Sequence, residues 1–365
     1  MRIYIINVFK MKKYVNIINN MKFLNLLNND DIDNINRNLD NLLLKYIKND
    51  IKLDLNDYSF LSNNHIDTDF IDKRIIKLKI YVKTLNRLKK YPFIAQRTKE
   101  WYEMRKNCLT ASDLFEGTCK NNLLLAKKKA GVYIDETNFT SIPPLKWGNM
   151  FEDMAIRCYR NDNRNVKVTE FGLIQNKDIK NFGASPDGIS DLGIMLEIKC
   201  PYSRKIQKNN IPEKYYYQIQ GQLAVCCLNE CDYIECEFKT LESDNDYIEN
   251  DSKYFGIIAE YYNEVENIYK YLYSDNNLSK IETFTDIDNK IKDFNEENFI
   301  FKKKTKWYLN DIYVQRIHFN EELWKDIYPK IGEFWLKVND CKSLPIEYKK
   351  KQEPVKYKFI DDKDT

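Results

Sequence analysis

The chain has 365 residues, of which 43% are hydrophobic and 31% charged, and its net charge is +3. These values are ordinary for a folded globular protein, and so small an excess of positive charge means that any surface for nucleic acid has to be local. Only two histidines are present, His65 and His318, which makes a Ser-His-Asp triad, a Cys-His protease or a multi-histidine zinc enzyme hard to build. If the chain is an enzyme, its chemistry has to depend on carboxylates, lysine and metal.

The nine cysteines are odd in number, and no two of them form a Cys-x-x-Cys pair. This pattern favours reduced thiols over a disulfide framework. The apolar run at residues 3–9 is too short and too interrupted for a signal peptide or a membrane span. We therefore expect an intracellular, soluble protein without a membrane partner, located in the host cytoplasm or, if it is viral, in a viral replication compartment.

Residues 1–92 are predicted to form a helical N-terminal extension. Apolar residues recur at helical spacing between Ile32 and Tyr46, and a second helix is expected over 70–88, ended by Pro92. The second helix is strongly basic. It has two interpretations: a solvated face, or a contact with a DNA backbone or a partner, because crowded like charges repel unless something anionic is near. The basic residues are Lys73, Arg74, Lys77, Lys79, Lys83, Arg87, Lys89 and Lys90.

Residues 93–340 are predicted to form one α/β domain, and residues 341–365 a charged tail. Helices and strands alternate in this domain, which is typical of a mixed sheet flanked by helices. The expected helices are 147–159, 215–228 and 321–338; the expected strands are 168–175, 194–199, 233–238, 254–259 and 308–319, the last being a strand or a hairpin with a turn at Asn310-Asp311.

A compact set of charges marks the middle of the domain. Asp187 follows Pro186, and Glu197 and Lys199 lie two residues apart on an expected strand, so their side chains share one face. Carboxylates are the ligands that Mg²⁺ prefers, and such an ion can stabilise and cleave a phosphodiester. We interpret Asp187, Glu197 and the Ile198 carbonyl as metal ligands, although a Glu-x-Lys pair alone is usually only a surface ion pair.

Two helices add polar groups to this set. Glu152 borders an apolar stripe on the helix that follows Trp147, where it is either a boundary residue or a further metal ligand. Gln218 enters a helix that is otherwise apolar. A glutamine there needs a partner for its amide, which is either a core group or the catalytic site.

Six motifs in order resemble those of the phage lambda exonuclease family, also called the YqaJ-like viral recombinase nucleases, within the PD-(D/E)xK superfamily. The resemblance covers roughly residues 96–238 and is closest in character to members from large DNA viruses. The motifs are Trp101-x3-Arg105, Thr110-Ala111-Ser112, Leu145-x-Trp147-Gly148-x3-Glu152, Ala184-Ser185-Pro186-Asp187-Gly188, Leu196-Glu197-Ile198-Lys199-Cys200-Pro201 and Gln218-Ile219-Gln220.

The resemblance implies a restriction-endonuclease-like core and an exonuclease that digests one strand of duplex DNA from a 5′ end, for recombination and repair by strand annealing. It implies a Mg²⁺ cofactor, in a two-metal site where Mn²⁺ can substitute. Glu152, Asp187 and Glu197 would bind the metal, and Lys199 and Gln218 would align the attacking water. The implied partners are DNA ends, further copies of the chain in a closed ring, and a single-strand annealing protein.

The resemblance also implies residues that hold the DNA end. Arg105 and Ser112 match positions that bind the 5′-phosphate, and arginine suits this role because its guanidinium binds phosphate in a bidentate manner. Thr110 and Arg204 are assigned to the same DNA-binding set. Leu145 matches an apolar residue that wedges into the terminal base pair, with packing in the core as its alternative.

Three other functions stay open from the sequence. An iron–sulfur nuclease would use Cys226, Cys227, Cys231 and Cys236, but their spacing favours buried apolar residues. A non-catalytic DNA-end-binding scaffold is disfavoured because all the acids and the lysine are present. A sequence- or structure-specific endonuclease of the same superfamily would need recognition elements, for which residues 241–340 offer room.

Overall fold

The computed structural model describes residues 68–135, 137, 141–163, 166–175 and 178–349, together with Arg37, Asp40, Asn41, Leu43, Leu44 and Ile47. Most of the expected helix between Ile32 and Tyr46, and the charged tail from residue 350 onward, lie outside the described residues. In the described part of the chain, no helix has both the length and the apolar character needed to cross a membrane.

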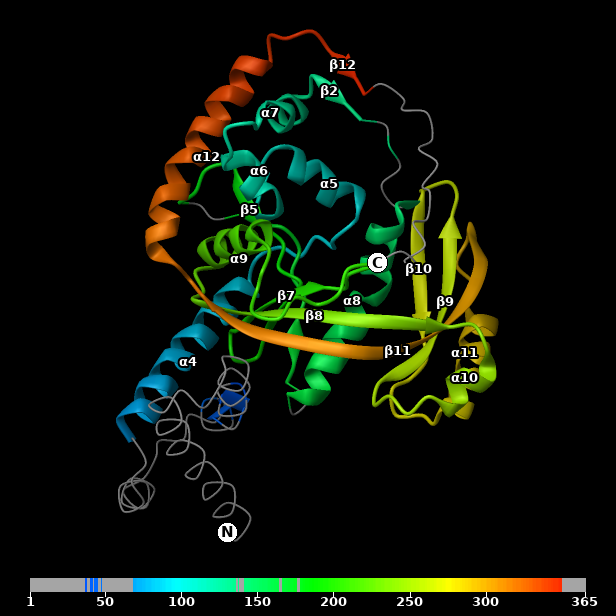
Figure 1. The fold of residues 1–365 in the computed structure, drawn as a ribbon. Coiled ribbons are helices and arrows are strands. Elements are labelled where there is room, and N and C mark those ends of the chain that lie inside the picture. Colours follow the sequence, from blue (N-terminus) through cyan, green and yellow to red (C-terminus); the bar gives the residue numbers. More distant parts are fainter. Residues whose placement is uncertain are drawn as a thin grey trace, which may run out of the picture.

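A curved sheet of seven strands forms the centre of the molecule (Figure 1). The pairing of β7 with β8 is parallel and the other five pairings are antiparallel, so the sheet is mixed. Together with the helices around it, this sheet confirms the predicted α/β class. The strands, in spatial order, are β10 (Ile268–Tyr273), β9 (Phe255–Asn263), β11 (Phe299–His318), β8 (Glu230–Leu241), β7 (Met195–Lys199), β6 (Gly188–Ser190) and β3 (Val168–Thr169).

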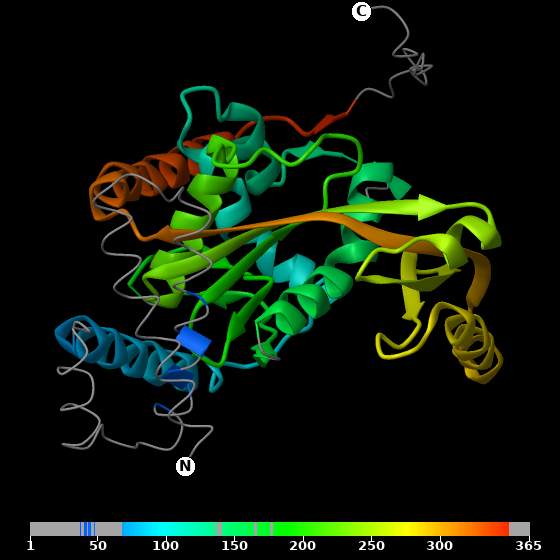
Figure 2. The ribbon, with the colours of Figure 1, turned by 60° about the horizontal axis from the view of Figure 1, so that its bottom comes forward.

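Helices cover both faces of the sheet at β7 and β8, and both strands are accordingly buried on both faces over most of their length (Figure 2). Leu196 and Ile198 pack with helix α8 (Pro143–Asp162). Met195, on the opposite face, packs in a second core with helices α9 (Glu213–Cys226) and α12 (Glu321–Cys341). Strands buried on both faces are expected where helices flank a sheet on each side.

Strand β11 is long enough to belong to two parts of the molecule. Its second half pairs with β8, whereas its first half pairs with β9. Strands β9 and β10, with helices α10 (Asp244–Glu249) and α11 (Lys280–Asp293), form a lobe that we call the wing (Figures 1 and 2). The Asn310-Asp311 pair is not a hairpin turn. It lies at a bulge, where the register shifts between Leu309 and Asp311.

The single strand expected over 168–175 is wrong. The structure has two short strands in different sheets: β3 in the central sheet, and β4 (Ile174–Gln175) paired with β5 (Phe182–Ala184), which also pairs with β1 (Leu109–Thr110). Gly172 lies between them, and a Cβ there would come within 2.1 Å of the Ile94 carbonyl oxygen. A close approach of another backbone segment, rather than strand pairing, explains this glycine.

Short elements complete the described chain. Helix α5 (Lys99–Lys106) is capped by Thr98 and is followed by strand β1. The others are η1 (Ala111–Asp113), α6 (Leu114–Thr118), α7 (Leu123–Ala130), β2 (Tyr133–Ile134) and β12 (Glu347–Tyr348), the last two forming a parallel pair.

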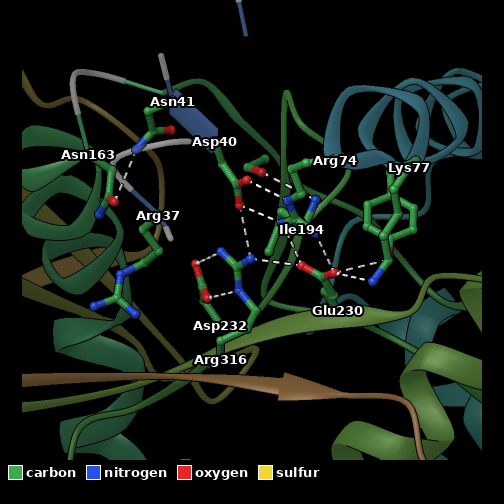
Figure 3. Close-up of polar contacts among 12 residues, drawn as sticks. Arg37, Asp40, Asn41, Arg74, Lys77, Asn163, Ile194, Glu230, Asp232 and Arg316 are labelled. Carbon is green, nitrogen blue, oxygen red and sulfur yellow. Dashed lines mark hydrogen bonds and ion pairs between the residues drawn. The ribbon is translucent and has the colours of Figure 1, made fainter. Parts of the chain in front are cut away.

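The basic helix predicted before Pro92 is α4 (Thr68–Leu88), and it is fastened to the sheet. Leu78 and Tyr81 pack with Leu192 and Ile194 in the turn between β6 and β7. Polar contacts reinforce this packing: Arg74 binds both Asp40 and Glu230, and Lys77 lies 2.8 Å from Glu230 (Figure 3). Two of the basic residues on this helix therefore contact acids of their own chain.

Arg316 on β11 lies at the centre of the same network (Figure 3). Its side chain is 4% exposed and binds Asp232 at 2.6 Å, Glu230 at 2.8 Å and Asp40 at 3.0 Å. Tyr159 of α8 donates a hydrogen bond of 2.6 Å to Asp232. Buried charges are costly unless they are paired in this way. The network therefore joins α4, α8 and Asp40 to the two long strands β8 and β11.

Candidate active site

The predicted charged residues meet where β7 ends. Asp187 lies just before β6, and its Oδ2 accepts a hydrogen bond of 2.7 Å from the backbone nitrogen of Ile198. Glu197 is fully buried and forms an ion pair with Lys199. The Lys199 ammonium also lies 4.8 Å from the ring of Tyr215 on α9. The two strands therefore bring Asp187, Glu197 and Lys199 together, as their spacing predicts.

A cavity of about 620 Å³ opens at this end of the strand. Ligand pockets usually measure about 300–1,000 Å³, so the space suits a nucleotide-sized group. Its walls come from the start of α8, the end of β7, the loop after β7 and the start of α9. Six residues that the sequence singles out line it: Leu145, Glu152, Asp187, Ile198, Lys199 and Arg204.

Negative charge converges on this cavity. Burial raises the pKa of Asp187 well above its usual value, and the nearby carboxylates of Glu197 and Glu152 raise it further. Burial likewise raises the pKa of Glu152. Burial acts to lower the pKa of Lys199, but Glu197 and Asp187 more than offset this, so that the pKa rises. Acids that disfavour each other's charge in this way attract a cation.

The donors fit a hard divalent cation such as Mg²⁺. In the described part of the chain, no group of three or more His, Cys, Asp or Glu side chains is placed to hold a metal ion by itself. Mg²⁺ does not need one, because it keeps several waters and takes only one or two carboxylates. Asp187, Glu197, Glu152 and the Ile198 carbonyl are all oxygen donors, and Lys199 holds Glu197 as its counter-ion.

Two residues of the site were not predicted. Gln222, four positions after Gln218, is 1% exposed and donates a hydrogen bond of 2.8 Å to Glu197 Oε2. Its position in the buried half of α9 was a usable signal, because a buried amide needs a partner. Arg97 binds Glu152, with Nη2 and Oε2 2.5 Å apart. Its left-handed backbone, with φ of 68°, has no signature in the sequence.

Gln218 lies one helical turn before Gln222, so the two share a face of α9. Gln218 is half-buried and is not among the residues that line the cavity. Gln222, rather than Gln218, holds the proposed metal ligand Glu197.

Arg105, Thr110 and Ser112 form a second cluster. Arg105 Nη2 donates hydrogen bonds to Ser112 Oγ at 3.0 Å and to Thr110 Oγ1 at 3.3 Å. Its guanidinium stacks over the ring of Trp101 at 4.2 Å. Trp101 in turn donates a hydrogen bond of 3.1 Å to Ser185, two residues before Asp187. The cluster is therefore linked to the acidic site through one tryptophan.

The two remaining DNA-binding candidates line the cavity in different ways. Leu145 is 49% exposed at the start of α8, so the alternative of core packing is wrong. Arg204 forms an ion pair with the buried Glu235, which also accepts a hydrogen bond of 2.6 Å from Tyr233. Arg204 is thus anchored to the sheet and still reaches the cavity wall.

The cysteines of the iron–sulfur alternative do not converge. Cys231 and Cys236 both lie on β8, but they pack in the two cores on opposite faces of the sheet. Cys227 is exposed and Cys226 is buried, and burial raises the pKa of Cys226 to about 12. Cys226, Cys231 and Cys236 therefore pack as small apolar side chains in the core.

Three known proteins are similar to this chain. Over 313 residues it is 26% identical to an uncharacterized protein of Acanthamoeba polyphaga mimivirus, covering 72% of this chain and 56% of that protein. The chain thus spans little more than half the length of this relative. An alkaline exonuclease of Laribacter hongkongensis, LHK-Exo, aligns with a TM-score of 0.41 and 18% identity, over 67% of this chain and 93% of that one. A phage-related exonuclease of Haemophilus somnus aligns with a TM-score of 0.36 and 10% identity, over 64% and 94% of the two chains.

A family model gives a match that coincides with the site. The model of the YqaJ-like viral recombinase domain matches residues 100–229. This range contains all six motifs in full, and it begins within α5 and ends just before β8. Residues 100–229 of this chain are therefore similar to the YqaJ-like viral recombinase domain, in the region where the motifs predict the resemblance.

Proposed function

We propose that this protein is a Mg²⁺-dependent exonuclease that digests one strand of duplex DNA from its 5′ end. The observation that carries the proposal is the convergence of Asp187, Glu197 and Lys199 at the end of β7, where Asp187 and Lys199 line a cavity together with Glu152. The match of this region to a viral recombinase domain supports a nuclease that acts in recombination.

The acids would hold the divalent cation and the lysine would act on the reacting phosphate. When bound, the ion supplies charge neutralisation at the phosphate and activation of the attacking water. Lys199 is poised as a cation, since Glu197 and Asp187 raise its pKa. In that state it neutralises phosphate charge and orients the nucleophile rather than removing a proton. Gln222 would hold Glu197 in place through its hydrogen bond to Glu197 Oε2.

The DNA end would be held by groups on the cavity wall and by the second cluster. Arg105 donates hydrogen bonds to the hydroxyl groups of Thr110 and Ser112, and these hydroxyl groups can themselves donate to a phosphate. The exposed Leu145 lines the cavity, where an apolar side chain would separate the last base pair. Arg204 supplies positive charge on the same wall.

The proposal includes partners that follow from the family resemblance. A closed ring of several copies around the duplex would keep the enzyme on its substrate, and a single-strand annealing protein would take up the strand that is left. Size-exclusion chromatography with light scattering tests the ring, since a monomer at working concentrations contradicts it.

One assay tests the activity and its direction. Linear duplexes labelled at the 5′ or the 3′ end, with a 5′-phosphate or a 5′-hydroxyl, are followed over time with Mg²⁺ and with chelator. We expect the 5′ label to be released first, and only with the metal. Asp187→Asn and Lys199→Ala should each lower the rate at least about 100-fold, the loss expected when a charged group acting on the transition state is removed.

Other outcomes would identify a different function. Cleavage of a covalently closed circular duplex indicates an endonuclease. Tight binding to ends without any cleavage indicates a DNA-end scaffold. Near-normal rates for both variants show that the catalytic site lies elsewhere.

A further inference from the structure

Arg97 is a charged residue at the acidic site to which the proposed function gives no task. Its Nη2 lies 2.5 Å from Glu152 Oε2, and its side chain is 43% exposed against 25% for Glu152. Burial acts to lower the pKa of Arg97, but Glu152 and then Asp187 raise it. The net pKa lies above the ordinary value of arginine. The guanidinium therefore rests on the acids themselves, with one side open to solvent.

The backbone at Arg97 is held in an unfavourable conformation by its neighbours. Its φ of 68° is in the left-handed region, which side chains other than glycine and asparagine rarely adopt. Gln96 donates hydrogen bonds to the carbonyl oxygens of Phe171 and Pro186, at 2.9 and 3.2 Å. Thr98, on the other side, caps α5. The backbone is thus held beside Asp187, whereas the long side chain is partly exposed to solvent.

The balance of charge shows what such a side chain can do. Glu152, Asp187 and Glu197 carry three negative charges when ionised, and Arg97 and Lys199 offset two of them. Lys199 is half-buried and is held between Glu197 and the ring of Tyr215. Arg97 is the more exposed of the two cations, so it is the one that a competing cation displaces at lower cost.

We propose that Arg97 is an exchangeable counter-ion: it neutralises Glu152 until a divalent cation takes that carboxylate, and its guanidinium then binds a phosphate of the DNA in the same cavity. The inference rests on the proposed function, because it needs the cation and the DNA. It makes Arg97 a residue that couples metal binding to DNA binding. If Arg97 and Glu152 formed a fixed structural ion pair instead, removing Arg97 would change DNA binding by the same factor with and without the divalent cation.

The first test measures metal binding without DNA, using the full chain. Arg97→Asn removes the charge and keeps a residue that tolerates a positive φ. Titration with MgCl₂, followed by calorimetry or thermal shift, should give a dissociation constant about fivefold lower than for the unchanged protein, as expected when a partly exposed ion pair no longer competes. Arg97→Gly, which suits the backbone best, should give the same gain.

A matched control removes an arginine from the same region. Arg157 lies on α8 and stacks on Tyr273 at 5.4 Å, away from the acids. Arg157→Asn changes the net charge by the same amount and should leave the Mg²⁺ affinity unchanged. An equal gain in Arg157→Asn would mean that overall charge, not the pair with Glu152, sets the affinity, and would overturn the proposal.

The second test measures binding to a fluorescent 5′-phosphorylated duplex, in chelator and in CaCl₂. In chelator, Arg97→Asn should bind only slightly more weakly than the unchanged protein, because the uncovered Glu152 repels the DNA but no contact with a phosphate is lost. In CaCl₂ the variant should bind at least about threefold more weakly, since it lacks the freed guanidinium. A deficit of the same size in both conditions would overturn the proposal.

Asp187→Asn separates failure of this inference from failure of the proposed function. If Asp187→Asn leaves the Mg²⁺ affinity unchanged, the ion does not bind among these acids, and both proposals fall. If Asp187→Asn weakens Mg²⁺ binding but Arg97→Asn behaves as the unchanged protein, only the exchange of Arg97 is refuted.

Discussion

Replacing Gln222 with leucine should reduce turnover much more than it reduces stability. Gln222 Nε2 donates one hydrogen bond of 2.8 Å to Glu197, whereas its Oε1 is buried without a hydrogen-bond partner in the described structure. A hydrogen bond to a charged group contributes about 1.5–3 kcal/mol, and an unsatisfied buried polar group costs about 1–3 kcal/mol. Leucine removes both, so the two effects on the free energy of unfolding largely cancel.

The same cancellation does not apply to catalysis. Without the amide, Glu197 loses the contact that fixes its Oε2, and its orientation at the end of β7 becomes less certain. If the full 1.5–3 kcal/mol of that contact serves to position Glu197, the rate should fall by about 10–100-fold, since each 1.36 kcal/mol is a factor of ten. The expected signature is a large loss of turnover with a change in unfolding free energy below about 1 kcal/mol.

Gln220, two positions away on α9, offers a matched control. It is fully buried, donates a hydrogen bond to the carbonyl oxygen of His318 at 3.0 Å and accepts one from the nitrogen of Asn320 at 2.7 Å. Gln220→Leu loses two satisfied bonds and should destabilise the fold by about 1–3 kcal/mol, with little effect on the turnover of the folded fraction.

Urea unfolding and initial rates on a 5′-phosphorylated duplex, at saturating Mg²⁺, measure both quantities for each variant. The reasoning fails if Gln222→Leu loses stability as Gln220→Leu does and keeps full turnover. That result would show that Gln222 is only a structural amide.

Two further predictions follow from the ion pairs. Arg105→Ala should slow digestion of 5′-phosphorylated ends more than that of 5′-hydroxyl ends, and an equal loss on both would remove Arg105 from the phosphate site. For the buried network, the pKa of Asp232 is held below its usual value because Arg316 outweighs the effect of burial. Its contribution to stability is therefore full above the unfolded pKa of about 3.9 and is lost as the pH falls through the lower folded value. Arg316→Met should lower the unfolding free energy by about 3–5 kcal/mol at neutral pH and flatten its decline in acid, as measured by urea unfolding at several pH values; an unchanged decline would contradict this sign.

The sequence indicated the centre of the fold and the site because both depend on short-range rules. Alternation on β7 puts Glu197 and Lys199 on one face, and apolar residues at helical spacing identify α4, α8 and α9. Asp187 and Glu197 converge because β6 and β7 are antiparallel, so that β6 begins beside the end of β7. These features need no knowledge of distant contacts.

The features that were missed depend on segments far apart in the chain. Gly172 breaks the expected strand because Ile94, from another segment, passes close to it. The Asn310-Asp311 pair is typical of a turn, but β11 continues through it with a bulge, because the strand is paired with β8 and β9 along its length. Arg97 binds Glu152 from a backbone in the left-handed region, and no propensity of arginine predicts that conformation.

The continuity of β11 ties the outer lobe to the chemistry. A strand of 20 residues extends about 66 Å at 3.3 Å per residue. One end forms a layer of the wing, and the other reaches His318, where Gln220 fastens it to the helix that carries Gln222. Strand β11 thus connects the wing directly to α9. A force on the wing, from a neighbouring protein or from bound DNA, would be transmitted along this strand to the helix that holds Glu197.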